Sequence, residues 1–480
     1  MACCFRYEPY PGDEERGCQF DLETAFTTLD DTTWCRFHLP MHDAAGNDSH
    51  KAGWDDSEID QFNQTVFNII DAAIDAGDEG DRRADLTGVV FPDRIDFKRY
   101  DKEHPFPHIL FRHTTFSGFA VFEKTTFSSD ADFAKAAFSN FADFEEATFL
   151  EYADFNKVAF SKAAFFHKAV FLEYVDFTAA TFSVEAVFRE TSFSTFAFFN
   201  DTTFSEDADF SGAAETPGGG GRRYDIRLKG ASDGDAAWKA EGEAVLPTTP
   251  SRSTFRRVDF SGATFGGAAD FNNRRFTDTT SFRGAIFERA PKFHNAVLHQ
   301  DTDFEEANFR DFRSINAERN YRTLKLAMET VRSRREEAMF FALEQRSLRN
   351  QPTTPRTVRW ASAFYDWAAE YGLSFVRPLW RMVQLFAVSW LSFWTLFGFF
   401  SAGQGPPLGR GADIFLFGLQ QVFRPFEVWS WRYEIAEPFK TLGIDELPLL
   451  IKAVATAETL VTYGLFTLFL LALRKRFRML

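Results

Sequence analysis

Residues 142–160 decide the fold, and they read ADFEEATFLEYADFNKVAF. Phenylalanine recurs here at alternating steps of five and six residues, as at Phe144, Phe149 and Phe155. The same alternation runs without a slip through residues 111–210, so the true repeat is eleven residues. Two positions before most of these phenylalanines stands a small or β-branched residue, with a polar residue between them. In-out-in over three residues is the period of a short strand, and strict internal periodicity is typical of a solenoid.

An eleven-residue period also describes three turns of α-helix. Steps of five and six would then place successive phenylalanines on opposite faces, with no single apolar stripe to bury. The residues between them are largely Thr, Ser, Asp and Asn, which are middling to poor helix formers. A coil of short strands that bury their phenylalanines therefore fits better. Its predicted core includes Phe133, Phe144, Phe155, Phe166 and Phe177.

Units such as ADFNK at 153–157, ATFLE at 147–151 and ADFSG at 208–212 resemble the pentapeptide-repeat family in its Phe-centred form. The resemblance implies a right-handed, four-sided β-helix, with the central Phe and the preceding small residue packed inside. The six-residue steps depart from the plain repeat and indicate an extra residue at alternate corners. With four sides per coil, as the family implies, the repeats predict roughly seven coils.

Changes of pattern along the chain predict six segments. In chain order these are an N-terminal Cys/His segment at 1–50, a capping helix at 51–80, the solenoid at 81–312, basic amphipathic helices at 313–350, an aromatic juxtamembrane linker at 351–377 and a membrane region at 378–480. A Gly-rich insertion at 212–253 interrupts the solenoid, and its glycines and prolines favour a flexible loop.

The details of the helical segments lead to further expectations. Ser57 and Asp60 are spaced as a capping box, and the helix that follows is expected to cover the open end of the solenoid. The helices at 313–350 either pair with the acidic solenoid and close its far end or bind anionic lipid head groups. Arg274 stands in a slot where a small residue is usual, so irregular packing is expected there.

The composition narrows the classes of function. The formal net charge is −16, which disfavours nonspecific binding to nucleic-acid phosphates, and no nucleic-acid partner is expected. No spaced Ser/His/Asp triad and no phosphate-binding loop is evident in the sequence. We therefore do not expect an enzyme.

The four cysteines all lie within the first 35 residues. Cys35 and His38 are spaced C-x-x-H, which puts two ligands on one turn, and Cys4 and Cys18 could complete a tetrahedral zinc site. Such a structural zinc would let a short segment with little core hold a fold. The alternative is a polar arm with reduced, unpaired thiols, and both interpretations stay open at this point.

Two apolar stretches near the C-terminus, at 382–400 and 453–473, are long enough to cross a membrane. Arg377 and Arg381 flank the first stretch, and the basic run 474–478 flanks the second, so both flanks are predicted to be cytoplasmic. No apolar signal segment follows the N-terminal methionine. The expectation is a multi-pass protein of the bacterial inner (plasma) membrane, in contact with the lipid bilayer, whose N- and C-termini lie in the cytoplasm.

The stretch between the spans, at 413–423, is too short to cross and is predicted to be re-entrant or interfacial. Span, half-helix and span resemble the pore module of two-span ion channels. They also resemble the C-terminal region of membrane-attached pentapeptide-repeat proteins, whose Tyr-Gly before the first span corresponds to Tyr371-Gly372. Residues 422–426 contain no glycine, so a carbonyl-lined potassium filter is unsupported. Glu458, inside the second span, is a candidate functional acid, although Lys452 and water could reach it.

These features lead to three hypotheses. The first is a non-enzymatic membrane-anchored scaffold whose rigid acidic solenoid binds an unidentified protein. The second is an oligomeric ion-channel-like or mechanosensory protein gated by the solenoid, which requires a homo-oligomer. The third is a DNA mimic that binds a nucleic-acid enzyme, as do relatives that occupy gyrase; those relatives are soluble, and this hypothesis ranks last.

Overall fold

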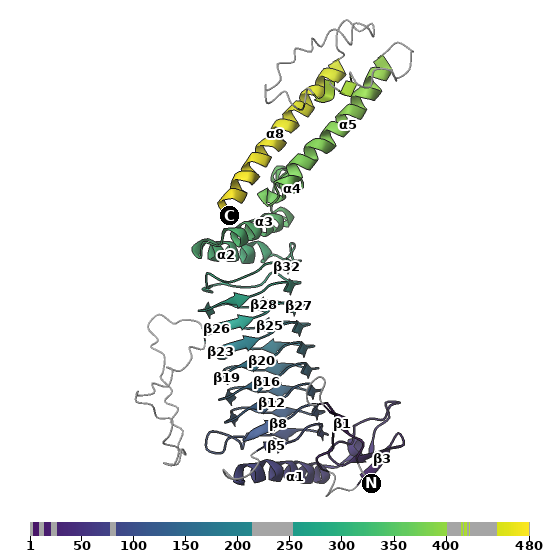
Figure 1. Cartoon of the computed structure of the whole chain (residues 1–480), viewed down its shortest axis with the longest axis vertical. Coiled ribbons are helices and arrows are strands. Elements are labelled where there is room, and N and C mark those ends of the chain that lie inside the picture. The colour runs from purple at the N-terminus through teal and green to yellow at the C-terminus, as the bar shows by residue number, and fades with distance from the viewer. Residues whose placement is uncertain are drawn as a thin grey trace, which may run out of the picture. The chain divides into compact units, whose positions relative to one another are not determined.

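The computed structural model in Figure 1 consists of two compact units, Met1–Ser333 and Arg334–Leu480. The residues that the structure describes are 3–8, 14–20, 26–76, 83–213, 253–400, 414–415, 417–419, 422 and 449–479. Most of the insertion predicted at 212–253 and most of the re-entrant piece predicted at 413–423 lie outside the described residues. Each unit is considered by itself.

The first unit contains a parallel β-solenoid made of very short strands, which confirms the solenoid predicted from the repeat. Along one side, nine strands pair in register: β6 (Val90–Phe91), β9 (Thr115–Phe116), β13 (Ala137–Phe138), β17 (Ala159–Phe160), β21 (Thr181–Phe182), β24 (Thr203–Phe204), β27 (Thr264–Phe265), β31 (Ile286–Phe287) and β32 (Asn308–Phe309). A second side has seven: β7 (Ile95–Asp96), β10 (Ala120–Val121), β14 (Ala142–Asp143), β18 (Ala164–Phe165), β22 (Ala186–Val187), β25 (Ala208–Asp209) and β28 (Ala269–Asp270).

The remaining strands form one twelve-stranded sheet that covers two sides, because β23 (Ser192–Phe198) and β26 (Thr254–Asp259) run on around a corner. Its other strands are β5 (Arg83–Asp85), β8 (His108–Leu110), β11 (Thr126–Phe127), β12 (Ala131–Asp132), β15 (Thr148–Phe149), β16 (Ala153–Asp154), β19 (Val170–Phe171), β20 (Val175–Asp176), β29 (Arg275–Phe276) and β30 (Thr280–Ser281).

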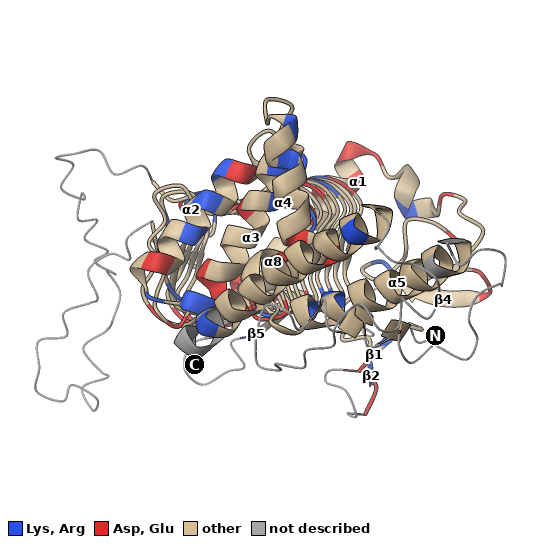
Figure 2. Ribbon diagram, turned by 90° about the horizontal axis from the view of Figure 1, so that it is seen from above, with Lys and Arg blue, Asp and Glu red and all other residues tan. Residues whose placement is uncertain are grey.

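One coil takes 22 residues, or two of the eleven-residue repeats, since Ala120 pairs with Ala142 and Ala142 with Ala164. Seen along the stack, the coils superimpose (Figure 2). The nine strands on one side show that the estimate of seven coils was too low. That estimate omitted the strands before Phe111, where the coil pattern already begins.

Phenylalanine rings fill the interior of the solenoid in continuous columns. Phe155 is fully buried and stacks on Phe133 at 4.8 Å and on Phe177 at 4.7 Å between ring centroids. Phe144 and Phe166, which are also buried, belong to another column with a 4.8 Å step. Neighbouring columns meet edge to face, with an angle of 89° between the Phe144 and Phe155 rings. This alternation of stacked and edge-on rings is the favourable geometry for aromatic quadrupoles.

Alternate corners of each coil contain a residue with a left-handed backbone. These residues recur every eleven positions, at His113, Lys124, Lys135, Glu146, Lys157, Lys168, Ala179, Glu190 and Asp201. Each is the third residue of a turn that begins at a core phenylalanine, and the Phe133 carbonyl accepts the Ala136 N–H at 2.9 Å. A left-handed residue with a side chain costs about 1–2 kcal/mol. Hydrogen bonds between coils offset this cost, as where the Lys135 N–H donates to the Asn156 carbonyl at 2.8 Å.

The insertion leaves the columns of rings continuous. Phe204 stacks on Phe265 at 5.1 Å, and Phe210 stacks on Phe271 at 5.3 Å. Only the column that contains Phe255 tilts, with 50° between the Phe193 and Phe255 rings. The solenoid therefore resumes in register after the insertion.

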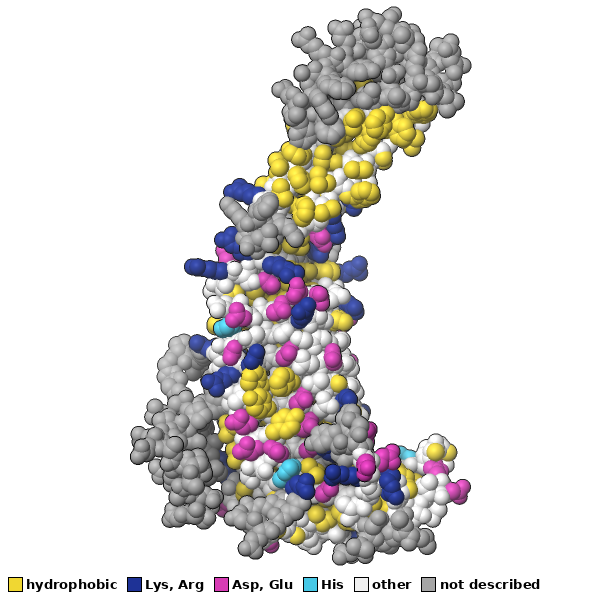
Figure 3. Space-filling model, viewed as in Figure 1, with side chains coloured by type: hydrophobic (Ala, Val, Ile, Leu, Met, Phe, Trp, Pro, Cys, Tyr) yellow, Lys and Arg dark blue, Asp and Glu magenta, His cyan; other side chains and the backbone are white. Residues whose placement is uncertain are grey.

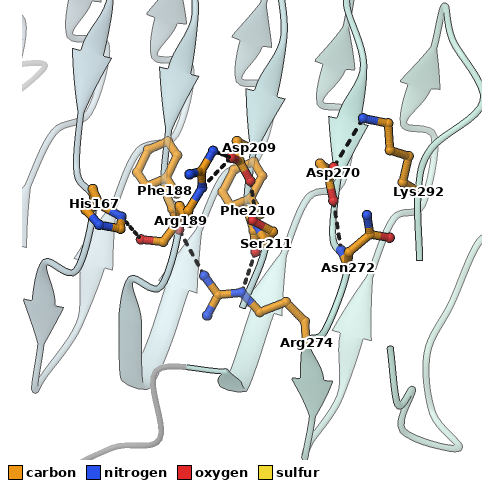
Figure 4. A network of polar contacts seen from close by, with 10 residues as sticks. All are labelled: His167, Phe188, Arg189, Asp209, Phe210, Ser211, Asp270, Asn272, Arg274 and Lys292. Carbon is orange, nitrogen blue, oxygen red and sulfur yellow. Dashed lines mark hydrogen bonds and ion pairs between the residues drawn. The ribbon is translucent and has the colours of Figure 1, made fainter. Parts of the chain in front are cut away.

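Arg274 compensates for the interruption at that corner (Figure 4). Its fully buried guanidinium lies 4.4 Å from the centre of the Phe255 ring. It donates to the carbonyls of Phe210 and Thr191, the latter at 2.8 Å. In an uninterrupted coil the carbonyl equivalent to that of Thr191 accepts a backbone N–H, as Ala169 accepts from Ser192. The irregular packing expected at Arg274 is thus a buried side chain that donates to backbone carbonyls beside the insertion.

Helix α1 (Asp56–Asp75) covers the N-terminal end of the solenoid. Its buried face includes Phe62, which meets Phe91 of the first coil edge to face at 5.8 Å. The N-cap of the helix lies two residues earlier than the sequence indicated. Asp55 and Glu58 form the capping box, and Ser57 and Asp60 do not, because the side chain of Asp55 accepts the Glu58 N–H at 3.0 Å.

Within the described part of the N-terminal segment, four short strands and a 3₁₀ helix precede α1. They are β1 (Arg6–Tyr7), β2 (Arg16–Gly17), β3 (Phe26–Leu29), β4 (Thr32–Cys35) and η1 (His50–Gly53). β1 pairs with β2 and β3 pairs with β4, both antiparallel. This segment joins the solenoid directly, since the Val90 N–H donates to the Phe37 carbonyl at 2.8 Å.

Helix α2 (Ala317–Thr330) covers the other end of the solenoid. Tyr321 is fully buried, its hydroxyl donates to the Asp311 carbonyl at 2.9 Å, and its ring meets Phe309 edge to face. Asn320 donates to the Ala290 carbonyl at 2.9 Å. Both ends of the stack are therefore closed by helices.

The second unit is helical and comprises α3 (Arg334–Asn350), α4 (Arg356–Ala369), η3 (Glu370–Gly372), α5 (Val376–Phe400) and α8 (Leu449–Met479). α5 and α8 pack side by side around Phe393, Ile451 and Ala455. Among the described residues, one helix, Leu449–Arg474 within α8, is long and apolar enough to cross a membrane. Residues 382–400 are helical within α5, and their crossing of a membrane stays a prediction.

Replacing Phe155 by Ala is expected to lower the free energy of unfolding by about 3–5 kcal/mol, because the cavity would break one column and open its neighbours. Denaturant unfolding of the detergent-solubilised chain, followed by circular dichroism, measures the loss. Phe119→Ala is the matched control, since that ring is 44% exposed, and it should cost less than about 1 kcal/mol. Equal losses in the two variants would contradict a core built on stacked rings.

Candidate functional site

The outer faces of the solenoid include one ladder of outward-facing, exposed or half-buried aromatic side chains beside β16 and β20. Tyr152 and Tyr174 are 37% and 45% exposed. The Tyr174 ring stacks on Phe196 at 5.1 Å, and Phe196 lies parallel to Phe198. Arg257 continues the ladder, with its guanidinium 4.8 Å from the centre of the Phe196 ring. We call these five residues the aromatic ladder.

Charged side chains surround the aromatic ladder. Figure 3 shows hydrophobic side chains gathered midway along this face, with acidic and basic side chains around them. Glu151 and Glu173, each one residue before a ladder tyrosine, are exposed. The ladder is therefore an apolar strip within a polar surface, an arrangement that is typical of binding sites.

A second set of exposed rings lies on the side formed by β10, β14 and β18. Phe119 stacks on Phe141 at 5.5 Å, and Phe141 lies 6.2 Å from Phe165. Phe119 and Phe141 are 44% and 39% exposed. Since β10 and β12 are separated by one side in chain order, this set and the aromatic ladder lie on opposite sides of the coil.

Aspartates at one outward position form a column along β12, β16 and β20. Asp154 accepts the N–H of Asn156 at 2.8 Å, and Asp132 and Asp176 make the equivalent bonds in the adjacent coils. Burial raises the pKa of the Asp154 carboxyl to about 7, with a further contribution from the charges of Asp132 and Asp176. These aspartates hold the corners of the coil in place, and nothing in their geometry resembles a catalytic pair.

Three cysteines and a histidine meet in the N-terminal segment. Cys3, Cys18, Cys35 and His38 are buried, and one ligand atom from each lies within 4.8 Å of all the others. The Cys18 and Cys35 sulfurs are 3.6 Å apart. His38 Nδ1 lies 3.2 Å from the Cys35 sulfur and 3.7 Å from the Cys3 sulfur. Three of the four predicted ligands are thus brought together.

Cys4, the remaining predicted ligand, does not belong to this cluster, and Cys3 takes its place. The backbone N–H of Cys4 donates to the Thr33 carbonyl at 2.8 Å, which fixes the chain here in an extended pairing. Successive side chains of an extended chain point to opposite sides. Cys3 therefore points inward, where it is fully buried, and Cys4 is only partly buried.

Glu458 lies between α5 and α8 and is 2% exposed. Ser389 of α5 is the polar side chain nearest to its carboxylate, but neither carboxylate oxygen makes a hydrogen bond of normal geometry with the described residues. Ser389 and Thr462, which are also buried, provide other polar groups in these two helices. A buried carboxyl without a partner is costly, so it marks a site that needs an explanation.

The helices predicted to be basic divide between the two units. α2 belongs to the solenoid, and α3 belongs to the second unit. Arg346 and Arg349 of α3 pair with Asp366 of α4 at 3.0 and 3.1 Å. Of the aromatic residues predicted at a membrane interface, Trp360 is 78% exposed, whereas Tyr371 is buried and shares a hydrogen bond with Ser362.

The pattern of inward phenylalanines does not predict the aromatic ladder, whose rings point outward. A signal was present, because Tyr152, Tyr174 and Phe196 recur at the 22-residue interval of one full coil. That interval places residues directly above one another on the outside of a solenoid.

Replacing Asp154 by Asn is expected to raise the melting temperature at about pH 8 and to change it little at about pH 4. The folded chain keeps a proton on Asp154 that the unfolded chain releases as pH rises from about 4 to 7, so ionisation favours unfolding over that window. Asn keeps the acceptor for the Asn156 N–H and cannot ionise. Thermal unfolding followed across this pH range measures the difference.

Asp209→Asn is the matched control, because Asp209 stands at the same place in the eleven-residue repeat, on the opposite side of the coil. Figure 4 shows its contacts with Arg189 and Ser211. Burial opposes ionisation there, but hydrogen bonds from Ser211 and Arg189 hold the pKa of Asp209 below its usual value. Its replacement should destabilise the chain at neutral pH, with the effect fading in acid. If both substitutions raise the melting temperature at neutral pH, or both lower it, the opposite pKa shifts assigned to Asp154 and Asp209 are refuted.

Comparison with known proteins gives one match. A family model described as pentapeptide repeats (9 copies) matches residues 122–170, which run from β10–β11 to β19 in the regular part of the solenoid. No curated protein and no solved structure matches the chain. The match supports the assignment of the solenoid to the pentapeptide-repeat family, as its stacked four-sided coils and buried central phenylalanines also do.

Proposed function

We propose that this chain is a non-enzymatic, membrane-anchored scaffold that binds a protein partner on the aromatic ladder. The observation that carries the proposal is a row of outward rings, in which Tyr152 and Tyr174 are exposed, the latter to 45%, and Phe196 and Phe198 are half-buried. Tyr and Arg are enriched at the energetic centres of protein interfaces. A preorganised row of them loses little conformational entropy on binding.

The charges around the ladder determine what kind of partner would fit. Exposed Glu151 and Glu173 stand beside Tyr152 and Tyr174, and the whole chain has a net charge of −16. Complementary charge speeds association and excludes partners of like charge. The partner is thus an apolar surface with a basic rim.

The membrane anchor rests on the surface of α5 and α8. Val388 and Leu391 of α5 are 64% and 61% exposed, and Leu460 of α8 is 66% exposed. Figure 3 shows hydrophobic side chains over the described part of these helices. Lipid would cover such a surface, and the arginines at the start of α5 and the end of α8 favour a cytoplasmic solenoid.

The partner is expected to copurify with the full chain extracted from membranes, and to be lost when the ladder is changed. The pair Tyr174→Ser and Phe196→Ser should lower recovery of the partner at least about tenfold, as for the loss of central interface residues. Affinity purification with quantitative mass spectrometry measures it.

The matched control is Phe119→Ser with Phe141→Ser, which removes two exposed rings from the opposite side of the coil. Equal loss in both pairs, or no loss in either, would refute the ladder as the binding site. Recovery of the chain in the soluble fraction would refute the anchor separately.

The buried Glu458 favours a second candidate, an oligomeric pore-forming protein. Acids inside spans commonly line ion or proton paths, and the carboxylate of Glu458 makes no hydrogen bond of normal geometry with the described residues. A symmetric ring of chains would place several such acids together.

The mass of the protein in nanodiscs distinguishes the two candidates. A ring whose ion flux falls in Glu458→Gln would favour the pore, and a monomer would exclude it. Glu344→Gln is the control, because that acid is also buried but lies in α3 outside the spans.

A further inference from the structure

The four side chains of the N-terminal cluster each place a ligand atom within 4.8 Å of the other three, as the ligands of a single metal ion must be. Tetrahedral Zn²⁺ with Zn–S of about 2.3 Å and Zn–N of about 2.0–2.1 Å sets S···S near 3.8 Å and S···N near 3.6 Å. The Cys18–Cys35 distance is 3.6 Å, and the distances from His38 Nδ1 to Cys35 and Cys3 are 3.2 and 3.7 Å. The spacing of the ligand atoms therefore fits one zinc ion.

A disulfide does not explain the cluster. The Cys18 and Cys35 sulfurs are 3.6 Å apart, and none of the four cysteines forms a disulfide, whereas a disulfide bond is about 2.05 Å long. Without a metal ion, burying three thiols and an imidazole against one another would contribute little to the stability of the fold. Thiolates with an imidazole are a ligand set that selects zinc over hard cations such as Mg²⁺ or Ca²⁺.

The groups around the cluster orient its ligands as metal-binding sites require. His38 Nε2 lies 2.9 Å from the Thr87 carbonyl. A carbonyl only accepts, so Nε2 bears the proton and Nδ1 keeps its lone pair for the metal. Two sulfurs accept backbone N–H groups at 3.3 Å: Cys3 from Cys35, and Cys18 from Phe20. Such bonds stabilise thiolates.

The cluster lies where the N-terminal segment meets the first coil. Thr87, which accepts the His38 hydrogen bond, belongs to that coil, and its carbonyl also accepts from Gln19 at 3.0 Å. Phe5 stacks on His38 at 4.1 Å and covers Gly88, where a Cβ would lie 2.0 Å from the Phe5 ring. The ligands are thus in direct contact with the end of the solenoid.

We propose that Cys3, Cys18, Cys35 and His38 Nδ1 bind one structural Zn²⁺ that fastens the N-terminal segment over the first coil. The sheets among the described residues of this segment are two-stranded, and such sheets are marginal on their own. A bound metal ion is one of the means by which so small a segment can gain enough stability to fold. The ion joins residues from three separate stretches of this segment, and the solenoid gains a cover for its open strands. This inference is independent of the partner-binding proposal.

Metal analysis of the full chain, purified in detergent without a metal-affinity step, is the direct test. About one zinc per chain is expected, falling below about 0.1 in Cys35→Ser or Cys3→Ser, as for removal of a ligand from a structural site. Cys4→Ser is the matched control, since it changes the adjacent thiol, and it should keep its zinc. Absence of zinc from the wild type, stoichiometric iron, or loss of zinc in Cys4→Ser alone would overturn the proposal.

A second measurement covers the case in which a ligand variant fails to fold. Zinc is removed from the wild-type chain with a chelator and replaced by Co²⁺, whose visible spectrum reports tetrahedral thiolate ligation. Hydrogen exchange is also compared between the metal-bound and the metal-free chain. The amides of residues 84–97 should exchange at least about tenfold faster without metal, and those of residues 133–177 should exchange at the same rate in both states. A cobalt spectrum without thiolate bands, or equal exchange with and without metal, would overturn the site or its fastening role respectively.

Discussion

The rest of this structure depends on the stacking of identical rings at the spacing of parallel strands. Strands in a sheet lie about 4.8 Å apart, and Phe155 lies 4.7 and 4.8 Å from its column neighbours. One spacing thus serves both the backbone hydrogen bonds and the ring contacts. Because the backbone hydrogen bonds and the ring contacts require the same spacing, each coil packs on the next in the same way. The interior therefore does not depend on a different set of complementary side chains in each coil.

A stack of this kind has two costs, at its ends and at its corners. The end strands present unpaired backbone groups, and helices α1 and α2 cover them with Phe62 and Tyr321 against the terminal rings. The corners require left-handed residues, which here are often Lys or Glu, where glycine would be free of strain. Hydrogen bonds between successive coils and the buried columns offset that strain.

Much of the fold could be predicted because each coil repeats the same local pattern. The steps of five and six residues show which side chains point inward, and α1 follows from its apolar face. Features that depend on a single contact could not be predicted. The choice of Cys3 over Cys4 depends on the pairing of Cys4 with Thr33. The buried guanidinium of Arg274 depends on carbonyls that belong to residues 64 and 83 positions earlier in the chain. The capping box at Asp55 differs by two residues from the expected one, and spacing alone does not distinguish them.

The membrane region shows a different limit. Length and apolarity predict where a helix could cross, but a helix buried in a protein can have the same composition. The burial of the Glu458 carboxylate depends on how α5 and α8 face each other, and periodicity along one chain does not contain that information.

The continuity of the columns across the insertion has a consequence for how such a chain can change. Since Phe204 and Phe265 stack at 5.1 Å across the insertion, against 4.9 Å for Phe182 and Phe204 without one, the insertion between Phe210 and Phe255 does not shift the register of the stack. A corner of the coil can therefore accept an insertion, provided that a nearby side chain supplies the hydrogen bonds that the backbone no longer makes. Arg274 is such a side chain. An insertion engineered at another corner would need a comparable buried donor to the backbone carbonyls left without a partner strand.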